Sequence, residues 1–239
     1  MNLPPPVLIS TSKALDHYCE QWLTCRALSI DTEFIRTQTY YPVPALLQVF
    51  DGQICYLIDP LHIDNFTSLQ AVFDNPDIIK ILHSCSEDLE VFTQIPGTLP
   101  SPLFDTQLAA AFVGYGFSIG YSRLVNRLFQ VELPKEETRS DWLQRPLSEK
   151  QVEYACLDVV YLYQLFEHLE ALLEKNNKSA WFKEECKTLL EIPDQSRSEE
   201  YILSRLKSGW RLSPQEQSYL KKLCLWREEQ ARTQNKPRN

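Results

Sequence analysis

The 239-residue sequence contains no run of 18 or more apolar residues, so it predicts no membrane-spanning helix. Its N-terminus lacks both the basic segment and the long apolar segment of a secretory signal. The seven cysteines are odd in number and scattered, without a C-x-x-C pair, which argues against a disulfide framework and against a zinc site. Together these absences predict a protein of a reducing compartment, most simply the cytoplasm.

Basic residues are also in the minority. The 24 Lys and Arg against 32 Asp and Glu give a formal net charge of −8. A protein of this charge does not hold nucleic acid through a globally basic surface. It is still compatible with a nucleic-acid enzyme whose acidic site binds divalent cations, because the ions would cancel part of the negative charge at the site itself. The hydrophobic fraction of 44% and the five tryptophans are sufficient for a core.

The pattern of apolar residues indicates a mixed α/β fold. It predicts strands over residues 27–34, 45–50, 54–58, 78–82 and 103–104. It predicts helices over residues 11–23, 63–74, 86–94, 105–113, 121–130 and 148–174. The Asp51-Gly52 pair between two strand patterns is a strong hairpin signal. We therefore expect an antiparallel meander followed by parallel strands, in one mixed sheet flanked by helices.

Two carboxylates stand close together on the first of these strands. Asp31 and Glu33 are two residues apart, so both side chains point to the same face of a strand at a spacing of roughly 7 Å. Two acids in this arrangement repel each other unless a cation or a proton lies between them. Mg²⁺ prefers oxygen ligands of this kind. The alternative is a solvated strand end, which is common for an isolated pair.

Further polar residues follow the strand over 78–82 and lie on the last long helix. Asp88 is expected in the first turn of a helix that Ser86 could cap, where an acid also favours the helix dipole without any ligand. Tyr154 and Asp158 are four residues apart, so on a helix they project from the same face. Local hydrogen bonding and a solvated helix face are the ordinary explanation for such a pair.

Taken together and in order, these motifs resemble the ribonuclease D family of 3′-to-5′ exonucleases, the tyrosine-bearing branch of the DEDD superfamily. The matching segments are Ser29–Phe34, Leu82–Phe92, Phe104–Ala110, Asp141–Leu147 and Tyr154–Asp158. The resemblance covers the chain from about Ile9 to Leu169.

The resemblance implies an RNase-H-like core in which four acids bind two divalent cations, Mg²⁺ or Mn²⁺. These acids are Asp31, Glu33, Asp88 and Asp158, and Tyr154 would orient the attacking water. The implied activity releases nucleoside 5′-monophosphates from the single-stranded 3′ end of RNA, such as a tRNA precursor. Single-stranded DNA is the alternative substrate, and a non-catalytic RNA-binding scaffold on the same fold is the alternative function. All five motif positions carry the expected residue, which favours an active enzyme.

Several residues near these motifs are candidates for substrate contacts, because stacking on unpaired bases and pairing with phosphates require aromatic and polar side chains. The candidates are Phe34, Gln48, His83, Arg139, Trp142 and Arg145. For Trp142, a buried position that fixes the connector before the last helix is an equally good interpretation.

The composition changes beyond residue 175. We expect an exonuclease domain over residues 1–175 and a helical C-terminal extension over residues 176–239. Ser213-Pro214 is a good helix start, with proline at the first helical position after a serine cap. This segment resembles the opening of an HRDC domain, a helical nucleic-acid-binding module. One such helix is present, so an independent copy of that module is not expected to form within these residues.

Overall fold

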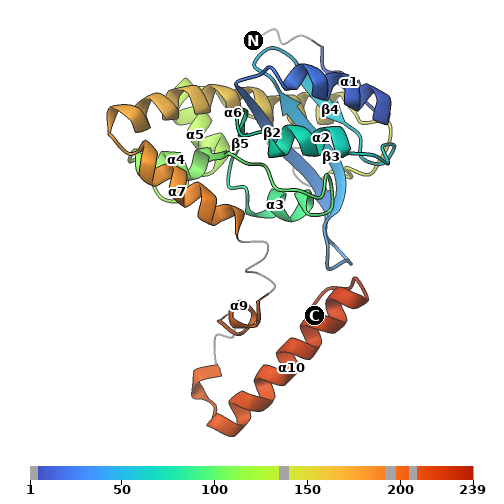
Figure 1. The fold of residues 1–239 in the computed structure, drawn as a ribbon, viewed down its shortest axis with the longest axis vertical. Coiled ribbons are helices and arrows are strands. Elements are labelled where there is room, and N and C mark those ends of the chain that lie inside the picture. The colour runs from blue at the N-terminus through green and yellow to red at the C-terminus, as the bar shows by residue number, and fades with distance from the viewer. Residues whose placement is uncertain (1–4, 135–139, 192–197, 205–208, 239) are drawn as a thin grey trace.

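A six-stranded mixed sheet lies at the centre of the computed structural model, which describes residues 5–134, 140–191, 198–204 and 209–238 (Figure 1). The strands are β1 Val7–Ile9, β2 Ala27–Ile35, β3 Val43–Phe50, β4 Cys55–Ile58, β5 Ile79–Leu82 and β6 Leu103–Asp105. Their order is β1-β4-β3-β2-β5-β6. The pairs β2–β3 and β3–β4 are antiparallel, whereas β1–β4, β2–β5 and β5–β6 are parallel. The expected α/β fold, with an antiparallel meander followed by parallel strands, is confirmed.

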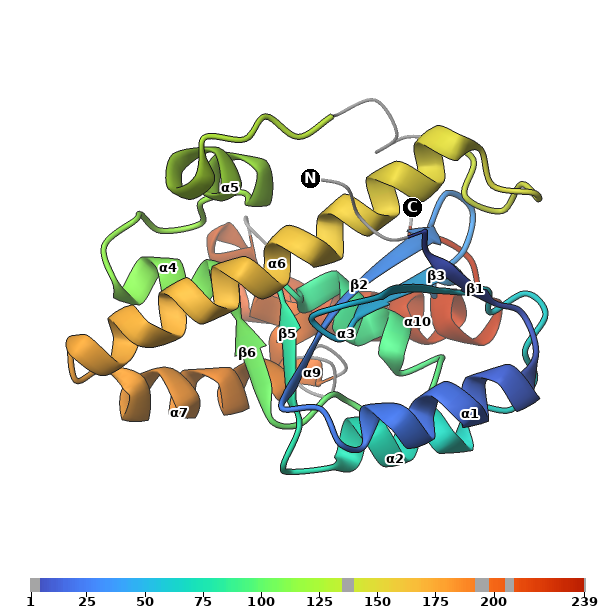
Figure 2. The same ribbon diagram turned by 90° about the horizontal axis from the view of Figure 1, so that it is seen from above.

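Helices cover both faces of the sheet (Figure 2). The helices of the body are α1 Ser12–Trp22, α2 Thr67–Asp74, α3 Ser86–Phe92, α4 Thr106–Phe112, α5 Tyr121–Phe129, α6 Glu149–Lys175 and α7 Ser179–Leu190. Beyond the body follow α9 Glu199–Ser204, a 3₁₀ turn η1 at Gly209–Arg211 and α10 Pro214–Thr233 (Figure 1). On one face, Ala155 and Val159 of α6 belong to a buried cluster with Leu46 and Leu57 of the sheet. On the other face, α1 and α2 pack into the larger core.

The predicted hairpin between β3 and β4 forms as expected. The Asp51 carboxylate accepts hydrogen bonds from the backbone N–H groups of Gln53 and Ile54, at 2.8 and 2.7 Å. Gly52 has φ = +97°, a conformation that a residue without Cβ adopts at little cost. A Cβ at this position would also lie 3.3 Å from the ring of Tyr163 on α6. Glycine is therefore required here by both the turn and the helix above it.

Two elements differ from the sequence-based expectation. The edge strand β1 was not predicted, because it has only three residues and directly follows a run of prolines. It is held by parallel pairing with β4, a contact that local sequence patterns do not reveal. The helix expected over residues 63–74 begins only at Thr67, where the Asn65 side chain accepts a hydrogen bond from the Thr67 N–H at 3.0 Å. This local turn replaces the first helical turn.

The helix α6 is well defined by its own sequence. Ser148 and Gln151 form a reciprocal capping box at its N-terminus. Eleven of its 27 residues are buried, so it is held against the sheet along most of its length. Since α6 carries Tyr154 and Asp158, this packing fixes the position of both side chains relative to β2.

The compact body extends beyond residue 175, where the exonuclease part was expected to end. Phe182 and Cys186 of α7 are each 2% exposed and belong to the same core as the sheet. The Phe182 ring centroid lies 4.6 Å from that of Phe104 on β6. The resemblance of the later helices to an HRDC opening stays a prediction. Among the residues that the structure describes, none of the helices has the length and apolar character that crossing a membrane requires.

The C-terminal helix α10 lies below the body in Figure 1 and is attached to the loop between β2 and β3. Tyr40 in this loop donates its hydroxyl hydrogen to the Glu228 carboxylate, and Arg238 donates to both Glu228 oxygens at 2.7 and 2.9 Å. Arg232 and Arg238 also donate to the Tyr40 hydroxyl, at 2.8 and 2.9 Å. Asn235 accepts from the Tyr40 backbone N–H at 3.1 Å. We call these five residues the C-terminal clamp.

Replacing Glu228 with alanine is expected to detach α10 while leaving the sheet intact. Glu228 is 3% exposed, and its removal leaves two arginines and a tyrosine without their shared acceptor. The carboxylate is buried while Arg232 and Arg238 are partly exposed, so the loss is expected to be smaller than for a fully buried ion pair but sufficient to release the helix. Limited proteolysis should then cut within α10 much faster than in the wild type, with little change in the melting of the body. Glu229→Ala, at the exposed neighbouring position, is the matched control; equal protection of both variants would contradict the clamp.

Candidate active site

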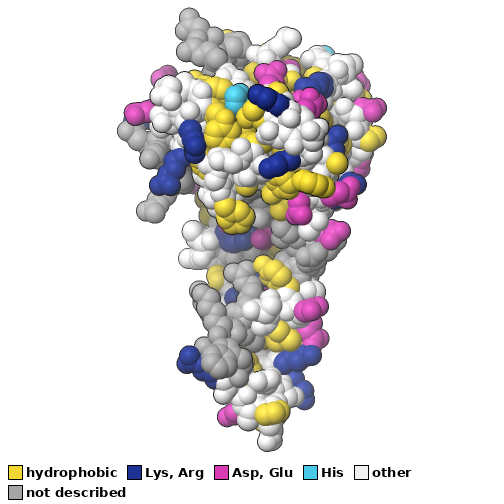
Figure 3. Space-filling model, turned by 90° about the vertical axis from the view of Figure 1, so that its left-hand side faces the viewer, with side chains coloured by type: hydrophobic (Ala, Val, Ile, Leu, Met, Phe, Trp, Pro, Cys, Tyr) yellow, Lys and Arg dark blue, Asp and Glu magenta, His cyan; other side chains and the backbone are white. Residues whose placement is uncertain are grey.

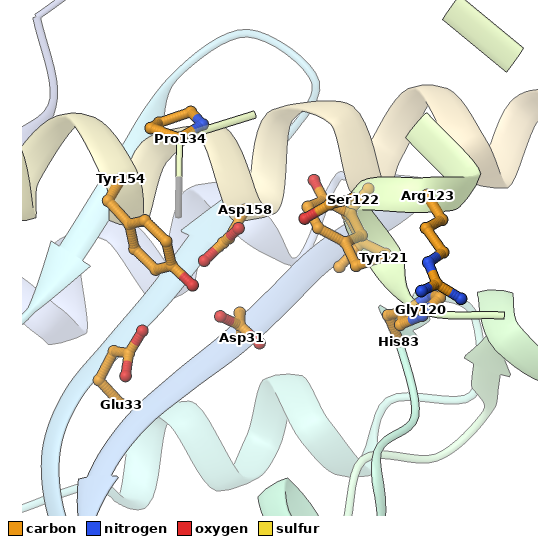
Figure 4. Close-up of a pocket in the computed structure, with 11 residues that line it drawn as sticks. Asp31, Glu33, His83, Gly120, Tyr121, Ser122, Arg123, Pro134, Tyr154 and Asp158 are labelled. Carbon is orange, nitrogen blue, oxygen red and sulfur yellow. The ribbon is translucent and has the colours of Figure 1, made fainter. Parts of the chain in front are cut away.

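Two elements bring three of the predicted acids together. Asp31 and Glu33 lie on β2, and Asp158 projects from α6, which crosses this face of the sheet. One carboxylate oxygen from each of the three lies within 4.8 Å of the others. Figure 4 shows these side chains facing one another across a pocket of about 510 Å³. The spacing of Asp31 and Glu33 on one strand face was predicted from the sequence; their meeting with Asp158 is a result of the fold.

The fourth predicted acid, Asp88, lies next to this cluster but is engaged differently. It is in the first turn of α3 and is 9% exposed. Its Oδ1 accepts a hydrogen bond of 2.5 Å from the hydroxyl of Thr32, which lies between Asp31 and Glu33 on β2. Cys85, rather than Ser86, precedes the helix, and it makes no side-chain cap. The structure therefore groups three acids closely. The fourth lies on α3 and is hydrogen-bonded to the Thr32 side chain of β2.

The electrostatics of the cluster favour a bound cation. Burial, followed by the nearby charges of Asp31, Asp158 and Asp88, raises the pKa of Glu33 to about 10. Burial, followed by the charge of Asp158, also places the pKa of Asp31 well above its usual range. Burial raises the pKa of Asp158 to about 7, against a hydrogen bond with Tyr154 that lowers it. Acids in this state need either protons or positive charge. A set of converging carboxylate oxygens is the donor type that Mg²⁺ and Mn²⁺ bind.

Tyr154 stands at the edge of the acid cluster. Its side chain descends from α6, and Figure 4 shows its hydroxyl pointing into the space between Asp31, Glu33 and Asp158. The ring is supported from behind by Trp142, with ring centroids 6.0 Å apart. A rigidly supported phenol in this place can hold a small polar molecule beside the carboxylates.

A β-bulge interrupts the pairing between β2 and β3 just beyond the second acid. The pairing register shifts between Glu33, which is opposite Leu46, and Phe34, which is opposite Pro44, so the extra residue is Ala45 and the bulge lies on β3. A bulge bends the strand and changes the direction of nearby side chains. Asp31 and Glu33 share a face through the regular alternation of β2, and the bulge follows them where β2 leads into the loop that holds Tyr40. Nothing in the local sequence signals it.

The structure adds pocket residues that sequence reasoning missed. The start of α5 forms one wall of the pocket, and with the segment after that helix it contributes Gly120, Tyr121, Ser122, Arg123 and Pro134. The Tyr121 hydroxyl donates to the Leu157 carbonyl oxygen at 2.8 Å, which ties α5 to α6 next to Asp158. The sequence predicts a helix over residues 121–130, but no motif indicates that this helix forms a wall of the pocket.

His83 lies in the pocket wall with both ring nitrogens occupied. Nε2 donates to the Ile119 carbonyl oxygen at 3.1 Å, and Nδ1 lies 2.9 Å from the Thr106 hydroxyl. Burial lowers the pKa of its imidazole. The ring also contacts Tyr121 edge-on, with centroids 5.6 Å apart. These contacts make His83 a neutral support of the wall, and they leave only the ring surface for a substrate contact.

Gln48 and Phe34 lie on the strands that carry the acids. Gln48 is opposite Asp31 in the ladder and is fully buried, so its side chain does not reach the open pocket. Neither of its amide atoms has a hydrogen-bond partner among the described residues. Phe34 is partly exposed beyond the bulge, with the guanidinium of Arg36 at 5.9 Å from its ring centroid. Of the two, Phe34 has the accessible position.

In the connector before α6, the two described candidates for substrate contacts bind to other parts of the protein instead. Trp142 is 2% exposed and packs in the core, the alternative that its sequence position also allowed. Arg145 donates to both oxygens of Asp59, at 2.7 and 2.9 Å, and to backbone carbonyl oxygens of Trp142 and Ala45. Because these hydrogen bonds within the protein occupy its guanidinium, Arg145 is not available to a substrate strand. Arg139 lies outside the described residues.

The raised pKa values predict a pH-dependent stability that metal should remove. In EDTA, the melting temperature is expected to fall as the pH rises from about 6 to about 9, because the folded-state pKa of Asp158 (about 7) and of Glu33 (about 10) exceed the ordinary values near 4. Their protonation stabilises the folded protein fully below that ordinary range, and this contribution is lost as the pH rises through the folded values. Millimolar Mg²⁺ should flatten the curve. Scanning fluorimetry measures both; an equally steep curve in the Asp158→Asn variant would contradict the assignment to this cluster.

Comparisons with known proteins place these observations in a family context. Residues 6–174 match the family model described as a 3′-5′ exonuclease. The chain is 46% identical over 231 residues to ribonuclease D of Pseudomonas paraeruginosa, covering 97% of this chain and 61% of that protein. The crystal structure of Escherichia coli RNase D, an exoribonuclease involved in structured RNA processing, superimposes with a TM-score of 0.90 at 39% identity, over 100% of this chain and 63% of that one. Brucella melitensis NrnC with bound Mg²⁺ gives a TM-score of 0.67 at 26% identity, over 80% and 92% of the two chains. The chain thus spans about three fifths of the length of the ribonuclease D proteins that it matches.

Proposed function

Because the chain belongs to the 3′-5′ exonuclease family, we propose that it is a metal-dependent exoribonuclease that shortens RNA from a free 3′ end and releases nucleoside 5′-monophosphates. The observation that carries this proposal is the meeting of Asp31, Glu33 and Asp158 within 4.8 Å, beside Tyr154, in an open pocket. Clustering partly buried carboxylates in this way is unfavourable unless protons or cations bind there. A purely structural or non-catalytic role gives no reason for it.

The proposed cofactors are two divalent cations, Mg²⁺ or Mn²⁺. Asp31, Glu33 and Asp158 would hold them, with Asp88 contributing its charge and, after release from Thr32, an oxygen. The structure of Brucella melitensis NrnC with bound Mg²⁺ supports the choice of magnesium. Bound divalent ions supply an activated water and charge stabilisation at phosphorus.

The protein's own side chains would orient and support this chemistry. Tyr154 would hold the attacking water in line with the scissile bond. A phenol is a poor base at neutral pH in general, which favours positioning over proton abstraction. The Trp142 ring behind it limits its rotation. Tyr121, bonded to the Leu157 carbonyl, would keep α5 closed against α6 on the opposite side of the pocket. Phe34 is the accessible aromatic residue for stacking on the terminal base.

The proposed substrate is RNA with a single-stranded 3′ end, such as the trailer of a tRNA precursor. Similarity to ribonuclease D over 97% of this chain supports RNA, and single-stranded DNA is the alternative. We also propose that residues 1–175 supply the catalytic part and that the helical extension is an incomplete HRDC-like segment. All seven cysteines are free thiols, which supports a cytoplasmic location.

A time course with 5′-labelled RNA bearing a 3′ tail, and with matched single-stranded DNA, tests the proposal in Mg²⁺, Mn²⁺ and EDTA. The expected result is a ladder that shortens from the 3′ end on RNA, with mononucleotide products, and that disappears in EDTA. Shortening of DNA alone would favour a DNA exonuclease. Intact RNA and DNA in both metals, with measurable binding, would favour a non-catalytic scaffold and overturn the proposal.

A further inference from the structure

Arg123 is a cation in a pocket otherwise dominated by acids. It is the only Lys or Arg among the described residues that line the pocket, and its side chain is exposed. Figure 4 shows it on the α5 wall beside Gly120 and His83, on the opposite side of the pocket from Tyr154 and Glu33. His83 does not add positive charge, because burial lowers the pKa of its imidazole.

Arg123 has no partner within the described part of the chain. No hydrogen bond, ion pair or ring contact with another described residue involves it, whereas Arg26, Arg36 and Arg145 are each bound to a carboxylate. Arg127, one turn further along α5, donates to the Tyr115 carbonyl oxygen at 3.0 Å and lies over the Tyr115 ring. An uncommitted guanidinium is available for an anion, and it can bind phosphate through two parallel N–H groups.

The position of Arg123 also indicates where a nucleic-acid strand could continue beyond the acid pocket. Ser122 and Arg123 line both the acid pocket and a second hollow of about 490 Å³, which Asn126, Glu132 and Leu133 complete. The two hollows therefore meet at Arg123. Glu132 makes no ion pair with it, and its negative charge disfavours phosphate deeper in the second hollow. A phosphate that enters this region is best placed at the junction, next to Arg123.

On this surface, a single cation near the site contributes much of the attraction to a nucleic-acid backbone. On the side of the molecule shown in Figure 3, Lys and Arg side chains are interspersed with Asp and Glu over the described surface. The chain as a whole carries a net charge of −8. Attraction of a nucleic-acid backbone therefore depends on individual cations near the site and not on a broad basic face.

We propose that Arg123 binds the phosphate on the 5′ side of the scissile phosphate and so makes the enzyme prefer strands with at least two phosphodiester bonds. This inference rests on the proposed function. The scissile phosphate must lie at the acid cluster, and the terminal nucleotide carries no phosphate beyond it. Every other phosphate of the substrate belongs to the retained strand, so the one at Arg123 does as well. Arg123 is in this sense a specificity residue that recognises chain length.

The test compares an unphosphorylated dinucleotide with the matching trinucleotide. For Arg123→Gln, kcat/KM on the trinucleotide is expected to fall about tenfold, mainly through KM, since a charge-assisted hydrogen bond is lost. The loss on the dinucleotide should be much smaller. The slope of log Kd against log salt for a short single strand should become shallower by about 0.7, the contribution of one phosphate contact. Arg123→Lys should restore the slope, and Arg127→Gln should behave as wild type.

The salt slope is measured by fluorescence anisotropy in an Asp158→Asn background, which binds without cleaving. An unchanged slope in Arg123→Gln, or equal losses on dinucleotide and trinucleotide, would overturn the assignment of Arg123 even if the enzyme is fully active. If the wild-type protein hydrolyses neither these substrates nor the 3′-tailed RNA, the proposed nuclease function fails. The anisotropy slope then still decides whether Arg123 contacts a phosphate.

Discussion

Replacing Asp31 or Asp158 with alanine is expected to reduce 3′-end hydrolysis of RNA by at least about 10³-fold while the protein stays folded. Both carboxylates belong to the cluster whose oxygens lie within 4.8 Å of one another, so either change would remove one of the proposed cation ligands. A loss of this size corresponds to about 4 kcal/mol of transition-state stabilisation. Initial rates in Mg²⁺, measured at saturating substrate, give the effect directly.

The same variants are expected to be as stable as the wild type, or slightly more stable, in EDTA. Removing one acid relieves the repulsion that raises the pKa of its neighbours. Denaturant unfolding in EDTA and in Mg²⁺ distinguishes this from a folding defect, because Mg²⁺ should stabilise the wild type but not the variants. Glu87→Ala provides the control: this acid is exposed, adjacent to Asp88, and outside the pocket. A variant of Asp31 or Asp158 with wild-type activity would disprove the site.

The second large effect is expected for Tyr154→Phe, which should lower kcat by about 10²-fold with little change in substrate affinity. The substitution keeps the ring against Trp142 and removes only the hydroxyl that points among the three acids. Misplacing a reactant by about 1 Å can cost a factor of this size. Single-turnover rates and binding to single-stranded RNA separate the two quantities.

Tyr161→Phe is the matched control for this prediction, since Tyr161 is a buried residue of the same helix outside the pocket. A rate for Tyr154→Phe equal to that of this control would remove the water-positioning role. A parallel loss of RNA binding would instead indicate that the phenol contacts the substrate. The raised pKa of Asp158 adds a second readout, because loss of the hydrogen bond from Tyr154 should raise it further.

Much of this site could be predicted from the sequence because its signals are local. The spacing of Asp31 and Glu33 on a strand, and of Tyr154 and Asp158 on a helix, determines which side chains share a face. The capping box at Ser148 fixes the start of the helix that carries Tyr154 and Asp158, and the turn at Gly52 fixes the hairpin β3–β4 beside the strand that carries Asp31 and Glu33. These are properties of a few consecutive residues, which sequence patterns report well.

What could not be predicted depends on contacts between distant segments. The α5 wall with Tyr121 and Arg123 is placed by packing against α6, and the bulge in β3 arises from its pairing with β2. Arg145 is hydrogen-bonded to Asp59, which lies 86 positions away in the sequence. Trp142 lies in the core because a buried cluster formed by distant segments takes up its ring, whereas Gln48 is buried by its central position in the sheet, with no hydrogen-bond partner for its amide among the described residues. A pattern of polar and aromatic residues gives their chemical character but not their partners.

The strand order also has a consequence for the time at which the site is assembled during synthesis. Asp31 and Glu33 lie on β2 in the middle of the sheet, but Asp158 lies on α6, and 127 positions separate the first and last of these acids (158 − 31). Domains generally fold as units and from the N-terminus as the chain emerges from the ribosome. A nascent chain that ends before α6 would hold two of the three clustered acids and no water-positioning tyrosine. The proposed nuclease would therefore stay inactive until α6 has been synthesised and has packed on the sheet.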